Sequence, residues 1–169
     1  NDLIFIETER ALVQFNNSEQ TEIETPPGWM DIEPISVAAE RGRAPVLITK
    51  RSGLFEMSID SGRLKLVPMW ESLPVTLDTA SITSSVSLEG DRYLLGTNSG
   101  GLILLAEDGA NLFSIDKRSG HRAGTIRSIV ALPDGSAMAF HDGGATWVDT
   151  QSEIRTWDQA NGLPSPVKI

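Results

Sequence analysis

The 169-residue sequence contains no cysteine, two histidines and one tyrosine. Without cysteine the chain forms no disulfide and has no thiol to act as a nucleophile or a metal ligand. It has no apolar run long enough to cross a bilayer. It opens on Leu3-Ile4-Phe5-Ile6 without the features of a signal peptide, so we expect any targeting sequence to be missing or removed. With 40% hydrophobic and 22% charged residues, the composition is that of a compact domain.

Motifs that carry catalytic or cofactor chemistry are also absent. Only His121 and His141 could act as bases near neutral pH without special tuning, and the neighbouring Asp142 does not define a nucleophile–base geometry. Two histidines twenty residues apart, without cysteine or a calcium-type acidic loop, predict no metal site. Residues 96–101 are glycine-rich but join two expected strands, so they lack the helix N-terminus that binds phosphate. We therefore predict no catalytic residue, no metal and no cofactor.

The net charge of −9 is concentrated at the start of the chain. Residues 1–40 hold nine acids against Arg10 alone, a balance of −8. Such a surface repels phosphate backbones, which argues against nucleic acid and anionic membranes as partners. We interpret the acids as solvent-facing residues of edge strands, where charge discourages sheet-to-sheet aggregation. The alternative is a surface that docks on a basic partner.

A repeated unit of short apolar strands and polar turns is the strongest positive signal. Its clearest copy is Tyr93–Leu105, and the matching positions Ala11, Gly53, Gly101 and Gly144 are 42, 48 and 43 residues apart. These steps are the lengths of β-propeller blades. Apolar and polar residues alternate with period two, and no stretch keeps a helical period over three turns. The sequence therefore predicts an all-β propeller of about four blades of four-stranded antiparallel sheets.

The strands can be assigned from this pattern. We predict blades at about 1–31, 32–79, 80–124 and 125–164, with 165–169 starting a next or closing strand. The expected strands are 3–7, 11–15 and 21–24; 34–40, 45–50, 53–60 and 63–68; 82–88, 92–97, 101–107 and 111–116; and 126–132, 137–141, 145–149 and 153–157.

Two arrangements of these blades fit the sequence. The chain could close a four-bladed ring through its last segment, or it could be part of a larger propeller. We favour the larger propeller, because neither end has the atypical capping repeat that repeat proteins need. Two copies could also pair as a homodimer to complete one ring.

Three groups of residues resemble a known repeat family. They are Tyr93-Leu94-Leu95-Gly96-Thr97 with Gly100-Gly101-Leu102, the turn Pro133-Asp134-Gly135, and the junction Gly162-Leu163-Pro164-Ser165. The pattern is similar to that of the two-component regulator propellers, the sensory ectodomains of bacterial hybrid histidine kinases and membrane-bound diguanylate cyclases. It is clear in the third and fourth blades, partial in the second and poor in the first.

The resemblance implies a ligand-binding, non-catalytic sensory module in the periplasm or another extracytoplasmic space. Such a module belongs to a longer bacterial signal-transduction protein, and any kinase or cyclase activity would lie outside this chain. Contact with a membrane would then come only through other segments of that protein. Two alternatives stay open: a fragment of a catalytic propeller, such as a polysaccharide lyase or glycoside hydrolase, and a structural protein–protein interaction module.

Candidate binding residues lie where the hairpins between the second and third strands of each blade meet the crossovers between blades. Their chemistry suits a small molecule, an oligosaccharide or a peptide as ligand. The candidates are Arg51, Asn98, His141 and Asp142 in the hairpins and Trp29, Trp70, His121 and Arg122 in the crossovers. The structural alternative is that turns favour Asn, Asp and Gly, and that the tryptophans fill gaps between blades.

Overall fold

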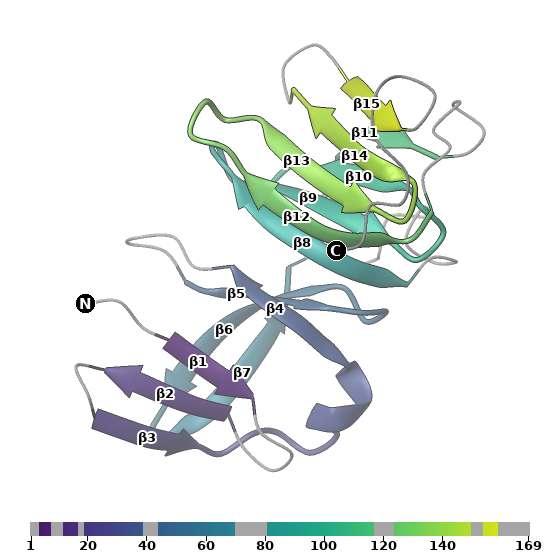
Figure 1. The fold of residues 1–169 in the computed structure, drawn as a ribbon. Coiled ribbons are helices and arrows are strands. Elements are labelled where there is room, and N and C mark those ends of the chain that lie inside the picture. Colours follow the sequence, from purple (N-terminus) through teal and green to yellow (C-terminus); the bar gives the residue numbers. More distant parts are fainter. Residues whose placement is uncertain are drawn as a thin grey trace. The chain divides into compact units, whose positions relative to one another are not determined.

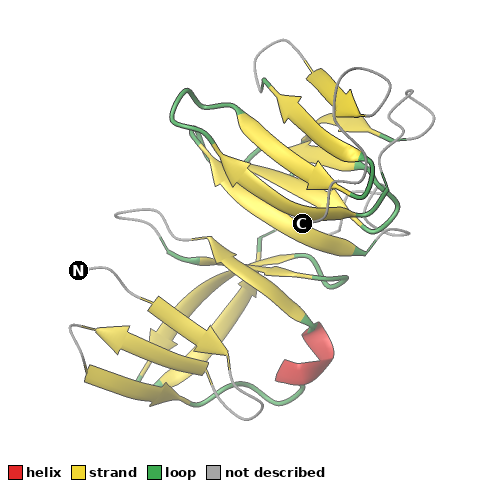
Figure 2. Ribbon diagram, viewed as in Figure 1, coloured by secondary structure: helices red, strands yellow, loops and turns green. Residues whose placement is uncertain are grey.

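The computed structural model describes residues 4–7, 12–16, 19–38, 44–69, 81–116, 124–149 and 154–158. Within these ranges the chain forms fifteen β-strands and one short 3₁₀ helix, η1 (Trp29–Ile32) (Figures 1 and 2). The strands build one three-stranded and three four-stranded sheets, and in each sheet the strands pair in sequence order. All pairs in these sheets are antiparallel. These meandering sheets are the blades of a β-propeller, which confirms the predicted fold class.

The four blades are named in chain order, and their strands lie within a few residues of the predicted bounds. Blade 1 holds β1 (Ile4–Glu7), β2 (Leu12–Asn16) and β3 (Glu19–Ile23). Blade 2 holds β4 (Pro34–Ala38), β5 (Val46–Thr49), β6 (Leu54–Asp60) and β7 (Arg63–Pro68). Blade 3 holds β8 (Ile82–Leu88), β9 (Arg92–Thr97), β10 (Leu102–Leu105) and β11 (Asn111–Ile115). Blade 4 holds β12 (Ile126–Ala131), β13 (Ala137–His141), β14 (Gly144–Val148) and β15 (Ile154–Asp158).

The chain divides into two compact units, residues 1–69 with blades 1 and 2 and residues 70–169 with blades 3 and 4. In the first unit, blades 1 and 2 share a buried cluster of Ile23, Trp29, Leu47, Met57 and Leu64. A short parallel bridge between Glu24 and Arg63 ties the blades at the surface. Glu24 N donates to the Gly62 carbonyl at 3.0 Å, and Leu64 N donates to the Glu24 carbonyl at 2.8 Å.

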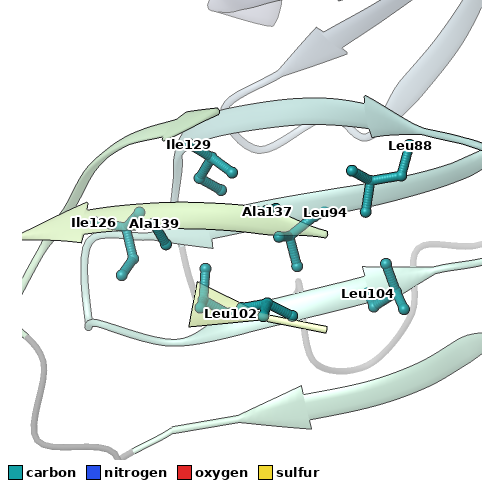
Figure 3. Close-up of a cluster of buried hydrophobic side chains, with 9 residues drawn as sticks. Leu88, Leu94, Leu102, Leu104, Ile126, Ile129, Ala137 and Ala139 are labelled. Carbon is teal, nitrogen blue, oxygen red and sulfur yellow. The ribbon is translucent and has the colours of Figure 1, made fainter. Parts of the chain in front are cut away.

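In the second unit, a larger cluster lies between blades 3 and 4 (Figure 3). Strand β10 and most of β9, the two middle strands of blade 3, are buried residue after residue. Strands β13 and β14 alternate between buried and half-buried positions, which is the period-two pattern seen in the sequence. The cluster consists of Leu88, Leu94, Leu102, Leu104, Ile126, Ile129, Ala137, Ala139 and Val148.

Gly96 sets how closely blade 4 approaches blade 3. A Cβ atom placed on Gly96 would lie 2.7 Å from Cβ of Ile126, a separation that real side chains do not show. Beside this contact, the Thr83 hydroxyl donates to the Ile126 carbonyl at 2.7 Å. The glycine is therefore required by the close approach of β12, since its backbone has no positive φ that would otherwise call for glycine.

We predict that Gly96→Ala lowers the free energy of unfolding by about 1–3 kcal/mol, because the added methyl group overpacks the interface with Ile126. Chemical denaturation measures this change. Gly143→Ala is the control, since its new Cβ would meet only the His141 ring at 3.5 Å, an ordinary contact. In a double-mutant cycle, Ile126→Ala should offset part of the cost of Gly96→Ala. Equal stabilities of the Gly96 and Gly143 variants would contradict this account.

Candidate functional site

The hairpins between the second and third strands of blades 2, 3 and 4 begin at equivalent positions. Thr49, Thr97 and His141 each pair with the first residue of the first strand of their blade, namely Pro34, Ile82 and Ile126. The Thr49 and Thr97 hydroxyls donate across their hairpins to the carbonyls of Gly53 and Gly101, at 2.7 and 3.2 Å. We label the four strands of a blade A to D in chain order. The end of the strands at which these hairpins lie is called the B–C end.

His141 occupies the threonine position in blade 4. Its side chain is only 3% exposed, and its Nε2 lies 3.1 Å from the Thr146 hydroxyl. The hairpin is also shorter here, because His141 pairs directly with Gly144. His141 therefore acts inside the hairpin, as a buried polar residue that links β13 to β14.

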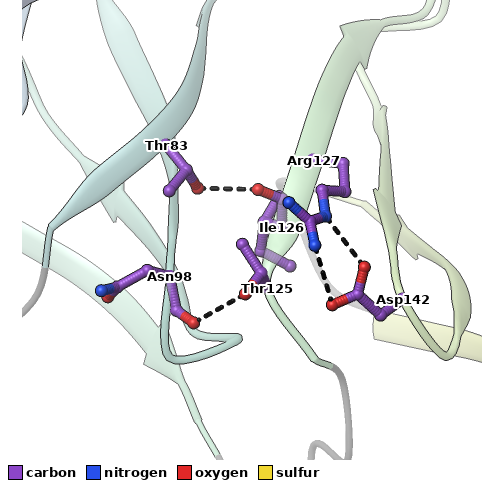
Figure 4. Close-up of polar contacts among 6 residues, drawn as sticks. All are labelled: Thr83, Asn98, Thr125, Ile126, Arg127 and Asp142. Carbon is purple, nitrogen blue, oxygen red and sulfur yellow. Dashed lines mark hydrogen bonds and ion pairs between the residues drawn. The ribbon is translucent and has the colours of Figure 1, made fainter.

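Asn98 and Asp142 are exposed at the B–C end of the second unit (Figure 4). The Asn98 carbonyl accepts a 3.0 Å hydrogen bond from the hydroxyl of Thr125, which joins the blade 3 hairpin to the start of blade 4. Asp142 accepts two hydrogen bonds from Arg127, Nε to Oδ1 at 2.8 Å and Nη2 to Oδ2 at 3.3 Å. The hydrogen bond from Arg127 is the main cause that holds the pKa of Asp142 below its ordinary value.

Gly124 allows the chain entering blade 4 to lie against this hairpin. A Cβ atom on Gly124 would be 2.9 Å from Cβ of Asp142. Gly124 therefore lies against the Asp142 hairpin, and the structure brings Asn98, His141 and Asp142 to the same end of one unit.

Arg51 lies in the other unit, and its side chain is 71% exposed. Its Nε is 4.0 Å from Oε2 of Glu33, while Lys50 donates to Oε1 of the same carboxylate at 2.6 Å. The Lys50 hydrogen bond, together with the charges of both cations, lowers the pKa of Glu33. Both contacts are exposed, so we expect them to contribute little to stability.

Of the four candidate residues predicted in the crossovers, the structure describes Trp29. Trp29 is 5% exposed and packs in the core between blades 1 and 2, as the gap-filling alternative proposed. Within the described part of the chain its indole N–H meets no acceptor, and its burial keeps this donor from a ligand in solvent. Trp70, His121 and Arg122 lie outside the described residues.

The sequence analysis missed a cavity of about 230 Å³ in the second unit. It lies at the opposite end of the strands from the B–C hairpins, where β8 turns into β9 and β12 turns into β13. We call this the A–B cavity. Its lining residues are Glu89, Arg92, Asp134, Gly135, Ser136, Trp147 and Asp149.

A short chain of hydrogen bonds fixes the blade 4 side of the A–B cavity. The Trp147 indole N–H donates to the Ser136 hydroxyl at 2.9 Å, and that hydroxyl donates to Oδ1 of Asp134 at 2.6 Å. The backbone N–H of Ser136 donates to the same oxygen at 3.0 Å. The Ser136 hydroxyl is the largest cause, and the backbone N–H the second, that lowers the pKa of Asp134. This carboxylate is therefore ionised and held in one orientation at neutral pH.

Three observations limit the chemistry of the described residues. No group of three or more His, Asp or Glu in the described ranges is arranged to hold a metal ion. Among the same residues, no helix has the length and apolarity needed to cross a membrane. The A–B cavity combines carboxylates, a guanidinium and an indole, which is a set that binds small polar molecules.

Comparison with solved structures identifies extracellular domains of bacterial two-component and one-component systems with the same fold. The extracellular domain of a hybrid two-component system from B. thetaiotaomicron matches 96% of this chain with a TM-score of 0.74 and 14% identity. That of a one-component system from the same organism matches 95% with a TM-score of 0.60 and 16% identity. The chain spans 22% of the length of each. No family model and no curated protein matches the sequence. At this identity the likeness establishes the fold, in agreement with the resemblance seen in the repeats.

We predict that Ser136→Ala raises the pKa of Asp134 towards its ordinary value, because the hydroxyl that lowers it is removed. Folding lowers the pKa of Asp134, so this carboxylate stabilises the folded state at pH values above the ordinary carboxyl pKa, near 4. This stabilisation is lost as the pH falls through the pKa of Asp134 in the folded protein. The variant should therefore lose less stability on acidification than the wild type. Carboxyl ¹³C NMR titration with acid unfolding measures both effects.

Ser99→Ala is the control for this experiment, since its hydroxyl contacts Thr97 at the other end of the strands. An unchanged Asp134 pKa in Ser136→Ala would show that the hydroxyl does not control this carboxylate.

Proposed function

We propose that this chain is the blade segment of an extracytoplasmic sensory module that binds a small ligand without transforming it. The observation that supports this is the likeness, over almost the whole chain, to the extracellular domain of a hybrid two-component system. A propeller fold hosts many functions, so the proposal also depends on the chemistry of the blade ends. Any enzymatic output would belong to other parts of a longer bacterial signalling protein.

The proposed ligand contacts lie at the B–C end of the blades. Asn98 presents an exposed amide, Asp142 an exposed carboxylate and Arg51 an exposed guanidinium. Trp70, His121 and Arg122 remain candidates from the sequence and lie outside the described residues. In the second unit, the amide of Asn98 and the carboxylate of Asp142 suit a sugar or a peptide, and in the first unit the guanidinium of Arg51 suits a small carboxylate.

The B–C end of the second unit is coupled to the packing of its two blades. Thr125 ties the Asn98 carbonyl to the start of blade 4, and Thr83 ties the Ile126 carbonyl to blade 3. A ligand that moves the Asn98 hairpin would therefore change the packing of β12 against blade 3. For this to act as a signal, the ligand must bind two packing states with different affinities.

We predict that Asn98→Ala and Asp142→Asn each weaken binding of the ligand by about tenfold or more, which is the usual effect of losing a hydrogen bond to a charged or amide group. Calorimetric titration of the chain with a panel of oligosaccharides, peptides and small carboxylates measures this. Asp108→Asn is the matched control, because Asp108 caps a turn at the opposite end of blade 3 through a 2.9 Å bond from Ala110 N.

Signalling by the protein that carries this chain gives the second readout. If no member of the panel binds, and substitutions at Arg51, Asn98 and Asp142 leave the output unchanged, the sensory proposal fails at these residues. Turnover of a polysaccharide that disappears on substitution of one carboxylate would instead identify a catalytic propeller.

A further inference from the structure

We propose that Thr83 is a conformational latch, whose hydroxyl holds blade 4 against blade 3 in one state and releases it in a second state. The hydroxyl lies within reach of two carbonyls, one in each blade. Its exchange between these carbonyls defines two packing states of strand β12. Only the use of the two states for signalling rests on the proposed function, because the latch is a property of the chain without ligand.

Thr83 has one hydroxyl proton and two acceptors for it. Its Oγ1 lies 2.7 Å from the carbonyl oxygen of Ile126 in blade 4 and 3.3 Å from that of Gly96 in its own blade. A hydroxyl donates one hydrogen bond, so it serves one of these carbonyls well at a time. The shorter distance identifies the bond to Ile126, drawn in Figure 4, as the one made in this structure. We call this arrangement the closed state.

The second acceptor lowers the free energy needed to open the contact between the blades. When β12 withdraws from blade 3, the Thr83 hydroxyl turns to the Gly96 carbonyl, and water reaches the Ile126 carbonyl. The hydroxyl therefore keeps a partner in both states, whereas a half-buried hydroxyl left without one would make opening costly. We call the arrangement with the bond to Gly96 the open state.

A β-bulge gives Thr83 its position between the two acceptors. The register of β8 against β9 shifts between Ile82 and Ser84, so Thr83 is the extra residue that has no partner in the ladder. An extra residue at a bulge is turned out of the regular pattern, which re-aims its side chain. Gly96 then takes part in both states. In the closed state its missing side chain leaves room for Ile126, and in the open state its carbonyl is the acceptor.

The other blades show that the repeat does not require this pair of residues. The first strands of blades 2, 3 and 4 each have a bulge at the same place, followed by a serine. The bulged residue and the residue opposite the serine are Thr83 and Gly96 in blade 3, Ile35 and Ile48 in blade 2, and Arg127 and Phe140 in blade 4. Of these three described pairs, one combines a hydroxyl with a glycine. The latch is therefore a departure from the repeat and specific to this contact.

Two further contacts are linked to the latch. Ile126 is completely buried, so its burial keeps the closed state dominant. The Thr125 hydroxyl bonds to the Asn98 carbonyl, so the exposed hairpin of blade 3 is tied to the start of β12. A ligand that binds the Asn98 hairpin more tightly in one state than in the other shifts the two populations by that difference in affinity.

Relaxation dispersion of isoleucine ¹³C-methyl groups tests the latch in the 169-residue chain without ligand, because it detects motions on the μs–ms timescale. We expect exchange at Ile126 and Ile129, which lie in the interface between blades 3 and 4, and none at Ile23 in the core of the first unit. Thr83→Val should raise the population of the minor state about fivefold or more, which corresponds to the loss of one hydrogen bond. The reason is that the buried Ile126 carbonyl loses its partner in the closed state, while water serves it in the open state.

Two further variants keep the test specific. Thr83→Ser retains the hydroxyl, so the population of the minor state should stay close to that of the wild type. Thr49→Val is the matched control, because it removes a hydroxyl-to-carbonyl bond of the same 2.7 Å length inside the hairpin of blade 2. It should leave the exchange at Ile126 unchanged.

The proposal is overturned if Thr83→Val shows no more exchange at Ile126 than the wild type does, or if Thr49→Val raises this exchange equally. It is also overturned if the exchange in Thr83→Val extends to Ile23, since that would be a general loosening of the chain. No ligand is present, so the result is separate from that of the sensory proposal. Binding at Asn98 without exchange at Ile126 would reject the latch alone, and exchange without any binding would support the latch alone.

Discussion

The second unit depends on the close packing of β12 against blade 3. At this contact Gly96 has no side chain because Ile126 occupies the space, and the Thr83 hydroxyl bonds to the Ile126 carbonyl. The contact buries Ile126 completely and, with it, the nine-residue core between the two blades. It also fixes the relative positions of the hairpins at both ends of the strands. The arrangement of residues at both ends therefore depends on the geometry of this interface.

Strands of this fold could be predicted from the sequence where successive side chains alternate between a buried face and a more exposed face of the sheet. Strands β13 and β14 show this directly, and their predicted bounds agree with the structure to within one residue. Gly96 was recognised as part of a repeat motif, but its physical reason was not, since the residue that needs the space is thirty positions away. His141 was predicted as a candidate binding residue in a hairpin. The structure shows that it takes the place of a buried hairpin threonine, which only the strand register reveals.

For a related reason, the A–B cavity could not be predicted from the sequence. Glu89 and Asp134 belong to turns that are common in any sequence, and each turn alone is explained by its own geometry. Only the packing of two blades brings their carboxylates into one space with Trp147. The neighbours of known structure share the fold at 14 to 16% identity, so they give no information about these particular side chains. Burial of Trp29, in contrast, was foreseen as one of two alternatives, because large aromatic residues in crossovers often fill gaps between blades.

Strands β12 and β13 run from one candidate site to the other, so both sites border the same interface between blades. Strand β13 begins next to Ser136 at the A–B cavity and ends at His141, next to Asp142 at the B–C end. Strand β12, which pairs with it, is the element that packs on blade 3. A ligand at either end that favours one packing of β12 must therefore change the affinity of a ligand at the other end, and linkage requires the two effects to be equal. The size of this coupling is set by the difference in affinity between the two packing states, so a rigid interface with a single state would leave the two sites independent.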